Sequence, residues 1–241
     1  MRSIHPSAEL ESATIASPPL RPLGQNMRKQ PAPLVRWRGR MEFAEALLEQ
    51  EALVERKWRE PDAPDEIWFL EHDPVYTIGR TSDQSSLRGA KHLPHPLFEI
   101  NRGGQATYHG PGQLMGYFLL DLRRHGQDLH RYLRWIEALL VELLAAYGIE
   151  ATTRAGLTGV WVGIGKIGSI GVGVRHWITM HGFALNVCGD LAPFSQITPC
   201  GIMDVQMTSM EQESGVVVPL EEIAATGIRL ARQRLGSLRA T

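Results

Sequence analysis

Three short segments combine residue types that could carry out chemistry, and each also has a plainer explanation. The first is Pro199-Cys200-Gly201. A cysteine between proline and glycine is expected in a turn at a loop tip, although a free cysteine is usually a small buried apolar residue. A reactive cysteine must be a thiolate, which a nearby cation or helix N-terminus stabilises. Cys200 is therefore the candidate nucleophile, and Cys188, which lacks this setting, is assigned a structural role.

The second segment is GKIGSIG, residues 165–171, in which Lys166 is the only charged residue of a glycine-rich, otherwise apolar stretch. Taken alone, such a lysine is more often a surface residue at the end of a strand. If it points into a pocket instead, its charge lowers the pKa of a nearby thiol. Lys166 and several of the histidines are therefore the candidate cations beside Cys200.

The third segment is RGGQATYHGPGQ, residues 102–113. Its double glycine lets the backbone approach a ligand closely or adopt a positive φ. The polar side chains that follow could hydrogen-bond a carbonyl or a head group, or could simply face water on a glycine-rich hairpin. The segment matches neither the Walker phosphate loop nor the dinucleotide fingerprint, which argues against a nucleotide site.

Composition excludes several classes of function. The nine histidines show none of the usual metal-ligand spacings, so no metal is predicted. A net charge of −1 gives no electrostatic case for nucleic acid as a partner. No apolar run approaches the roughly 20 residues that span a bilayer, and no secretory signal is evident. Two cysteines do not suggest a disulfide framework. We therefore expect a cytoplasmic protein with no membrane partner.

Helices that must position these segments can be read from the apolar periodicity. It predicts amphipathic helices over residues 41–58 and 128–147, and a last helix that Pro219 opens. Residues 1–33 contain six prolines and no sustained periodicity. We therefore predict a disordered N-terminal extension over residues 1–33 and a catalytic domain over residues 34–235.

Strands are indicated by short apolar stretches rich in β-branched and aromatic residues. They are predicted over residues 67–70 and 114–122, with three consecutive antiparallel strands between residues 159 and 187. A polar loop is expected over residues 81–97. Because strands and helices are mixed without strict βαβ alternation, the predicted class is α+β with a mixed sheet.

Taken together and in this order, the three segments resemble the signature regions of the lipoyl(octanoyl) transferase family. The matching stretches are RGGQATYHGPGQL, GKIGSIG followed by HGFALNV, and PCG. Each alone would be weak evidence, whereas the ordered set is specific. The resemblance covers about residues 34–235 and implies a catalytic domain like that of the biotin and lipoate protein ligases.

The resemblance also implies an activity and its site. Octanoyl would pass from octanoyl-acyl carrier protein to the lipoyl-domain lysine of 2-oxoacid dehydrogenase E2 subunits and of the glycine-cleavage H protein. Cys200 would be the acyl-accepting nucleophile, and Lys166 would lower the pKa of its thiol. No cofactor is implied, and we expect a monomer. The implied substrate-binding residues are Arg102, Gly103, Gly104, Gln105, Ala106, Thr107, Tyr108, His109, Ser169, Ile170, Gly171, Gly182, Phe183 and Ala184.

The reaction needs hydrogen-bond donors for the oxyanion of its tetrahedral intermediate. Backbone amides around Gly201 or within the Ser169–Gly171 stretch are candidates.

Three other functions stay open: an ATP-dependent lipoate or biotin ligase, a non-catalytic module that binds lipoyl domains or carrier protein, and a cysteine hydrolase with His109 or His181 as base. The PCG cysteine favours the transferase over the ligase, which does not need it.

Overall fold

The computed structural model describes residues 31–80, 83–88, 93–202 and 205–238. Residues 1–30 of the predicted N-terminal extension therefore lie outside the described part. The strands are β1 (Leu34–Met41), β2 (Glu66–His72), β3 (Val75–Gly79), β4 (Leu97–Ile100), β5 (Thr107–His109), β6 (Gln113–Leu119), β7 (Thr152–Arg154), β8 (Leu157–Val162), β9 (Gly165–Arg175), β10 (Ile178–Asn186) and β11 (Gln206–Met207). The α-helices are α1 (Phe43–Arg59), α2 (Leu129–Ala145), α3 (Met210–Ser214) and α4 (Leu220–Arg234). The short 3-10 helices are η1 (Ser85–Leu87), η2 (Leu122–Arg124), η3 (Ala192–Gln196), η4 (Pro199–Gly201) and η5 (Leu235–Leu238).

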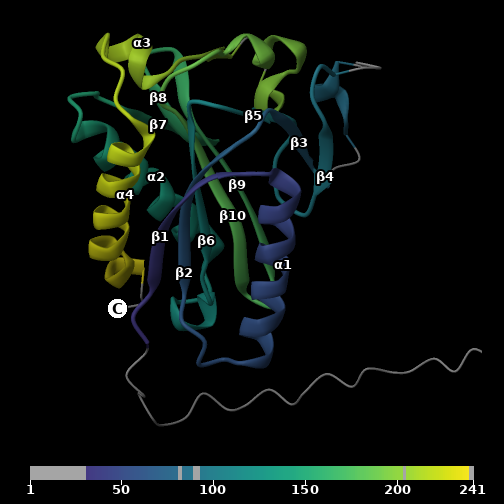
Figure 1. Cartoon of the computed structure of the whole chain (residues 1–241), viewed down its shortest axis with the longest axis vertical. Helices are drawn as coiled ribbons and strands as arrows, with labels where there is room; N and C mark the ends of the chain where they lie inside the picture. Colours follow the sequence, from purple (N-terminus) through teal and green to yellow (C-terminus); the bar gives the residue numbers. More distant parts are fainter. Residues whose placement is uncertain (1–30, 81–82, 89–92, 203–204, 239–241) are drawn as a thin grey trace, which may run out of the picture. The chain divides into compact units, whose positions relative to one another are not determined.

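A mixed eight-stranded sheet runs in the order β1-β2-β6-β10-β9-β8-β7, and β11 pairs with β9 (Figure 1). The pair β1–β2 is parallel, whereas β2–β6, β6–β10, β10–β9 and β9–β8 are antiparallel. This confirms the α+β class with a mixed sheet, and β8, β9 and β10 are the three antiparallel strands predicted between residues 159 and 187. A second sheet of three strands has the order β4-β3-β5.

Alternation of side chains along the central strands places helices on both faces of the large sheet. In β2, Ile67 and Phe69 join the apolar cluster formed with α2 and α4, whereas Trp68 and Leu70 join the cluster under α1. Strand β6 alternates in the same way, and Figure 1 shows α1 on one side of the sheet and α2 and α4 on the other.

The three predicted helices are present with small shifts of their ends. Asp128 caps α2, where its side chain accepts a hydrogen bond from the amide of Arg131, and Pro219 occupies the N-cap of α4. The predicted strand over residues 114–122 ends earlier, at Leu119, because residues 122–124 turn into η2. No helix in the described part of the chain has both the length and the hydropathy of a bilayer-crossing segment.

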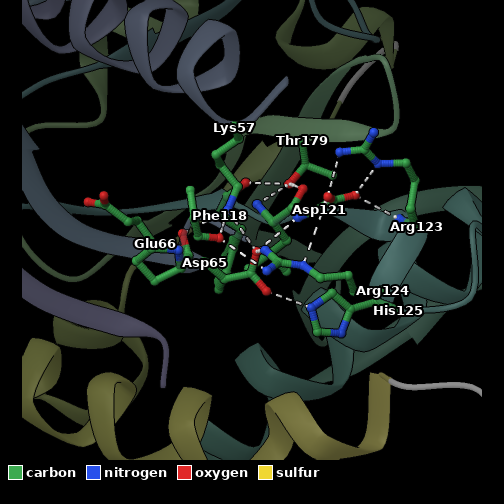
Figure 2. Close-up of polar contacts among 12 residues, drawn as sticks. Lys57, Asp65, Glu66, Phe118, Asp121, Arg123, Arg124, His125 and Thr179 are labelled. Atoms are coloured by element: carbon green, nitrogen blue, oxygen red, sulfur yellow. Dashed lines mark hydrogen bonds and ion pairs between the residues drawn. The ribbon is translucent and has the colours of Figure 1, made fainter. Parts of the chain in front are cut away.

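A buried charge cluster joins the end of α1, the start of β2 and η2 (Figure 2). Asp65 lies at its centre and accepts hydrogen bonds from Lys57 Nζ at 2.9 Å and from His125 Nε2 at 2.7 Å. Arg124 also pairs with this carboxylate, and the amide of Asp121 donates to it at 2.9 Å. The cluster ties α1 and β2 to the segment that follows β6, and so fixes the layers on which the site is built.

Candidate active site

A cavity of about 180 Å³ lies between β9, β10, the loop that precedes β5 and the turn that joins β7 to β8. All the predicted substrate-binding residues line it except Gly103, Ala106 and Tyr108. The lining residues that sequence reasoning did not name as substrate-binding are Phe43, Ile100, Met115, Tyr117, Gly156, Leu157, Thr158, His181 and Ile202. The cavity is mostly apolar, as a pocket for a small acyl chain would be.

The three exceptions have simple structural reasons. In β5, Thr107 and His109 face the cavity, so the intervening Tyr108 faces the other way. Tyr108 and Ala106 pack instead in a separate apolar cluster of Tyr76, Ile78, Phe194 and Ile197. Gly103 contributes its backbone, since its amide donates to the carbonyl of Val172 at 3.0 Å and holds the loop against β9.

Glycines on β9 allow that loop to lie directly on the strand. A Cβ at Gly173 would stand 2.1 Å from the carbonyl oxygen of Asn101, and one at Gly171 would stand 2.9 Å from Cδ of Arg102. With the loop in this position, Arg102 donates to the carbonyl and to Oγ1 of Thr77, at 3.0 and 2.9 Å. The glycine-rich segment is therefore a docked loop and not a hairpin that faces water.

A chain of hydrogen bonds continues from Thr77 through His109 to Gln113. Thr77 Oγ1 and His109 Nε2 are 3.3 Å apart, and His109 Nδ1 and Gln113 Oε1 are 3.3 Å apart. Burial, together with the neighbouring His72 and Arg102, holds the pKa of His109 well below its usual value. The ring is therefore neutral: Nδ1 donates to Gln113, and Nε2 accepts from Thr77.

A second polar group lies on the same wall. His72 Nδ1 contacts the carbonyl of Met41 at 2.7 Å, and His72 Nε2 contacts the hydroxyl of Tyr117 at 2.7 Å. The ring of Tyr117 also makes an edge contact with that of His181. Burial lowers the pKa of His181 to about 3, and its Nε2 has no hydrogen-bond partner among the described residues. His109 and His181, the bases considered for a hydrolase, both line the cavity.

Lys166 is buried, with 1% of its surface exposed, and it lines the cavity. Its Nζ donates to the carbonyl of Thr158 at 3.3 Å and lies 5.1 Å from the centre of the Trp161 ring. Lys166 therefore points into a pocket and is not the surface residue that a lone lysine at a strand end usually is. Strands β8 and β9 bring Trp161 and Lys166 into register, which places the ammonium against the ring.

The PCG turn forms η4 beside the cavity, and the side chain of Cys200 lies outside the described residues. The turn is anchored by the amide of Thr198, which donates to the carbonyl of Ser86 at 2.7 Å. A Cβ at Gly201, which has φ +68°, would stand 2.8 Å from Cγ of the cavity residue Gln105. The amide of Gly201 donates to the carbonyl of Thr198 at 3.0 Å, so this candidate oxyanion donor is engaged within the turn.

Cys188 follows β10 and packs against the main apolar cluster. Its amide donates to the carbonyl of Gly112 at 3.0 Å. Burial and the nearby carboxylates of Glu211 and Glu71 raise the pKa of its thiol, which disfavours the thiolate. These surroundings suit the structural role expected for this cysteine.

Comparisons of the sequence with known proteins agree with this geometry. Residues 42–229 match a family model described as the lipoyl protein ligase A/B catalytic domain. A protein of Geobacter sulfurreducens named octanoyltransferase is 50% identical over 185 residues, which are 77% of this chain and 77% of the relative. An octanoyltransferase of Synechococcus elongatus is 47% identical over 173 residues, covering 71% of this chain and 74% of the relative.

Solved structures share the fold at low sequence identity. A bipartite lipoate protein ligase from Thermoplasma acidophilum superposes with a TM-score of 0.62 at 18% identity, covering 84% of each chain. A biotin protein ligase from Aquifex aeolicus gives a TM-score of 0.52 at 12% identity, over 86% of this chain and 70% of that one. The ligase-like architecture expected from the sequence is thereby confirmed.

Proposed function

The chain belongs to the lipoyl protein ligase A/B catalytic-domain family, and from this we propose that it transfers octanoyl from octanoyl-acyl carrier protein to lipoyl domains. The enzyme is an acyltransferase of protein lipoylation. The acceptors in the proposal are the lipoyl domains of 2-oxoacid dehydrogenase E2 subunits and the glycine-cleavage H protein. A cytoplasmic location belongs to the proposal too, because a reducing compartment keeps the nucleophilic thiol free.

In the first step of the proposed mechanism, the thiolate of Cys200 attacks the carbonyl carbon of the octanoyl thioester. The new carbon–sulfur bond forms as the bond to the carrier's sulfur breaks. The carrier leaves as a thiol after taking up the proton of the Lys166 ammonium, which leaves that amine neutral for the second step. Exchange of one thioester for another is nearly balanced in energy, so a covalent intermediate divides the transfer into two easier steps. Lys166, as an ammonium, stabilises the thiolate that begins this step.

In the second step, the amine of the lipoyl-domain lysine attacks the acyl-enzyme. An amide bond forms, the bond to Cys200 breaks, and one proton leaves the attacking nitrogen while the thiolate is released. Lys166 in its neutral form accepts that proton.

The burial of Lys166 carries this proposal. Lys166, a candidate cation for the thiol of Cys200, lines the same cavity as Gln105 and Ile202. Gln105 lies against the PCG turn, and Ile202 directly follows it. Arg102 and the predicted acyl-binding stretches of β9 and β10 complete the wall. A buried ammonium beside an apolar, acyl-sized cavity is the arrangement that a thiolate-based acyl transfer requires.

The proposal is tested by incubating the protein with octanoyl-acyl carrier protein and an apo lipoyl domain without ATP. The intact mass of the lipoyl domain is then measured by mass spectrometry. We expect octanoylation of the domain. A parallel reaction supplies free octanoate and ATP. Modification only in that reaction would identify a ligase, release of free octanoate without modification would identify a hydrolase, and neither would leave a binding module.

A further inference from the structure

Glu137 is a buried carboxylate on the face of α2 that packs against the large sheet, with 1% of its surface exposed. Its Oε1 accepts a hydrogen bond from the amide of Gly159 at 3.0 Å. Its Oε2 pairs with Arg134 Nη1 at 2.8 Å, and the side chain of Arg134 is 52% exposed. Burying a carboxylate is costly, so a position at which one persists invites a functional explanation.

The amide that Glu137 holds belongs to the peptide unit that also contacts Lys166. The carbonyl of Thr158, on the other side of that unit, accepts from Lys166 Nζ at 3.3 Å. A trans peptide is planar, and its N–H and C=O point in opposite directions. Fixing the N–H on Glu137 therefore aims the carbonyl at the ammonium.

Gly159 makes this arrangement possible. Its φ of +139° lies in a region that side-chain-bearing residues rarely adopt, and the pairing of β8 with β9 shifts register directly after Val160. A Cβ at Gly159 would stand 2.8 Å from Lys166 Cε. The lysine side chain thus passes directly over the glycine, and the peptide held by Glu137 forms the surface on which it lies.

We propose that Glu137 is a positioning residue for Lys166, acting through the Thr158–Gly159 peptide. The inference rests on the proposed function, because it assigns Lys166 to the acyl-transfer site. Glu137 itself touches no substrate. It holds the carbonyl that accepts the hydrogen bond of Lys166 Nζ, and so fixes where the ammonium lies on the cavity wall.

Substitutions at Glu137 can separate the effect of its negative charge from the effect of its side-chain length. Glu137→Gln keeps an oxygen at the same distance and removes the charge, whereas Glu137→Asp keeps the charge and withdraws the oxygen by one methylene. Glu137→Leu removes both. Glu142→Gln is the matched control, since Glu142 lies on the same helix and pairs at the surface with Arg234 at 2.7 Å.

Two readouts separate positioning from a merely structural role. The first is the rate of Cys200 alkylation by iodoacetamide over about pH 5–9, followed by intact mass in a Cys188→Ala background. The second is the division of the effect between kcat and the KM for octanoyl-acyl carrier protein. Among the described residues, the other charged or titratable groups that face this region are Arg134 on α2 and Arg154 over Trp161, and on the cavity wall Arg102, His109, Tyr117 and His181. They are unchanged in all these variants, and thermal midpoints confirm that each variant is folded.

We expect Glu137→Asp and Glu137→Leu to shift the alkylation curve to higher pH and to lower kcat roughly 10- to 100-fold with KM unchanged. Glu137→Gln and Glu142→Gln should behave as the wild type. An alkylation curve and a kcat for Glu137→Asp that match those of the wild type would overturn the inference. A fall in kcat for Glu137→Gln as large as that for Glu137→Asp would also overturn it. Lys166→Met is measured alongside. If it leaves the alkylation curve unchanged, Lys166 does not act on the thiol, and the mechanism proposed for the transfer fails independently of Glu137.

Discussion

Lys166 and Trp161 face each other across β8 and β9, with Nζ of the lysine 5.1 Å from the centre of the indole ring. The ring and the carbonyl of Thr158 hold the amine against the cavity, where its ammonium form would stabilise a thiolate. Lys166→Met should therefore slow octanoyl transfer by about 100-fold or more, because both the cation and the proton acceptor are lost. The measurement is the steady-state rate with octanoyl-acyl carrier protein, at matched thermal stability. A rate within twofold of the wild type would contradict the role given to Lys166.

The close approach of the 101–103 loop to β9 predicts a second effect. A methyl group at Gly173 would meet the carbonyl oxygen of Asn101 at 2.1 Å, so the loop must move. Gly173→Ala should raise the KM for octanoyl-acyl carrier protein several-fold by displacing Arg102 from the cavity wall. Gly236→Ala is the control, since a Cβ there has no neighbour within 4 Å. Equal KM values in the two variants would show that the loop does not shape the site.

Much of this fold could be predicted from local pattern. Helices α1, α2 and α4 bury one apolar stripe each, and the antiparallel run β8–β10 consists of short apolar segments interrupted by glycines. The β8–β9 turn contains Gly163, whereas His176 and Trp177 form the β9–β10 turn with positive φ. The short strands β3, β5 and β7 could not be predicted in this way. Each has between three and five residues, too few for a period to be recognised. In addition, β3 pairs with β4 and β5 across a long intervening segment, whereas β7 pairs with the adjacent β8.

The residues of the candidate site likewise fall into those that could be predicted from the sequence and those that could not. Lys166, Arg102 and the glycines stand out because their residue types are unusual in their local setting. Tyr117 and Glu137 do not, since each lies in a regular element whose pattern is explained by the core. His72 and His181 are far apart along the chain, and only the pairing of β2 with β6 and of β6 with β10 brings them to Tyr117.

The buried cluster of Figure 2 predicts an acid-sensitive contribution to stability. Burial alone would raise the pKa of Asp65, but the hydrogen bond from His125 and the charges of Lys57 and Arg124 outweigh it and hold the pKa far below its usual value. A lowered folded-state pKa stabilises the protein above the unfolded value of about 3.9, and this stability is lost as the pH falls below it.

Asp65→Asn should therefore lower the free energy of unfolding at pH 7 by about 3–5 kcal/mol, because it leaves buried cations without their partner. The difference from the wild type should stay constant down to about pH 5 and then shrink as the pH falls through about 4 and below. Urea denaturation at several pH values measures both. The surface pair of Glu142 with Arg234 provides the comparison, and Glu142→Gln should cost less than about 1 kcal/mol. A pH-independent difference for Asp65→Asn would contradict the assignment.

We predict that the ring of His181 remains neutral over a pH range in which an exposed histidine takes up a proton. Burial lowers its pKa to about 3, so its ring stays neutral from pH 8 to pH 5 in the folded protein. The unfolded ring takes up a proton below about pH 6.5, so this histidine contributes stability above that pH which declines as the pH falls. Nitrogen chemical shifts of the ring, recorded by NMR across this range, measure the protonation directly. A midpoint between pH 6 and pH 7 would show that the ring is solvated.

The acyl-enzyme is the central claim, and intact-mass spectrometry after incubation with octanoyl-acyl carrier protein alone tests it most directly. The wild type and Cys188→Ala should each gain one octanoyl group, which hydroxylamine removes as expected for a thioester. Cys200→Ala should gain none, and Lys166→Met should gain it slowly. An adduct that persists in Cys200→Ala, or no adduct on a wild-type protein that still octanoylates lipoyl domains, would contradict transfer through this cysteine.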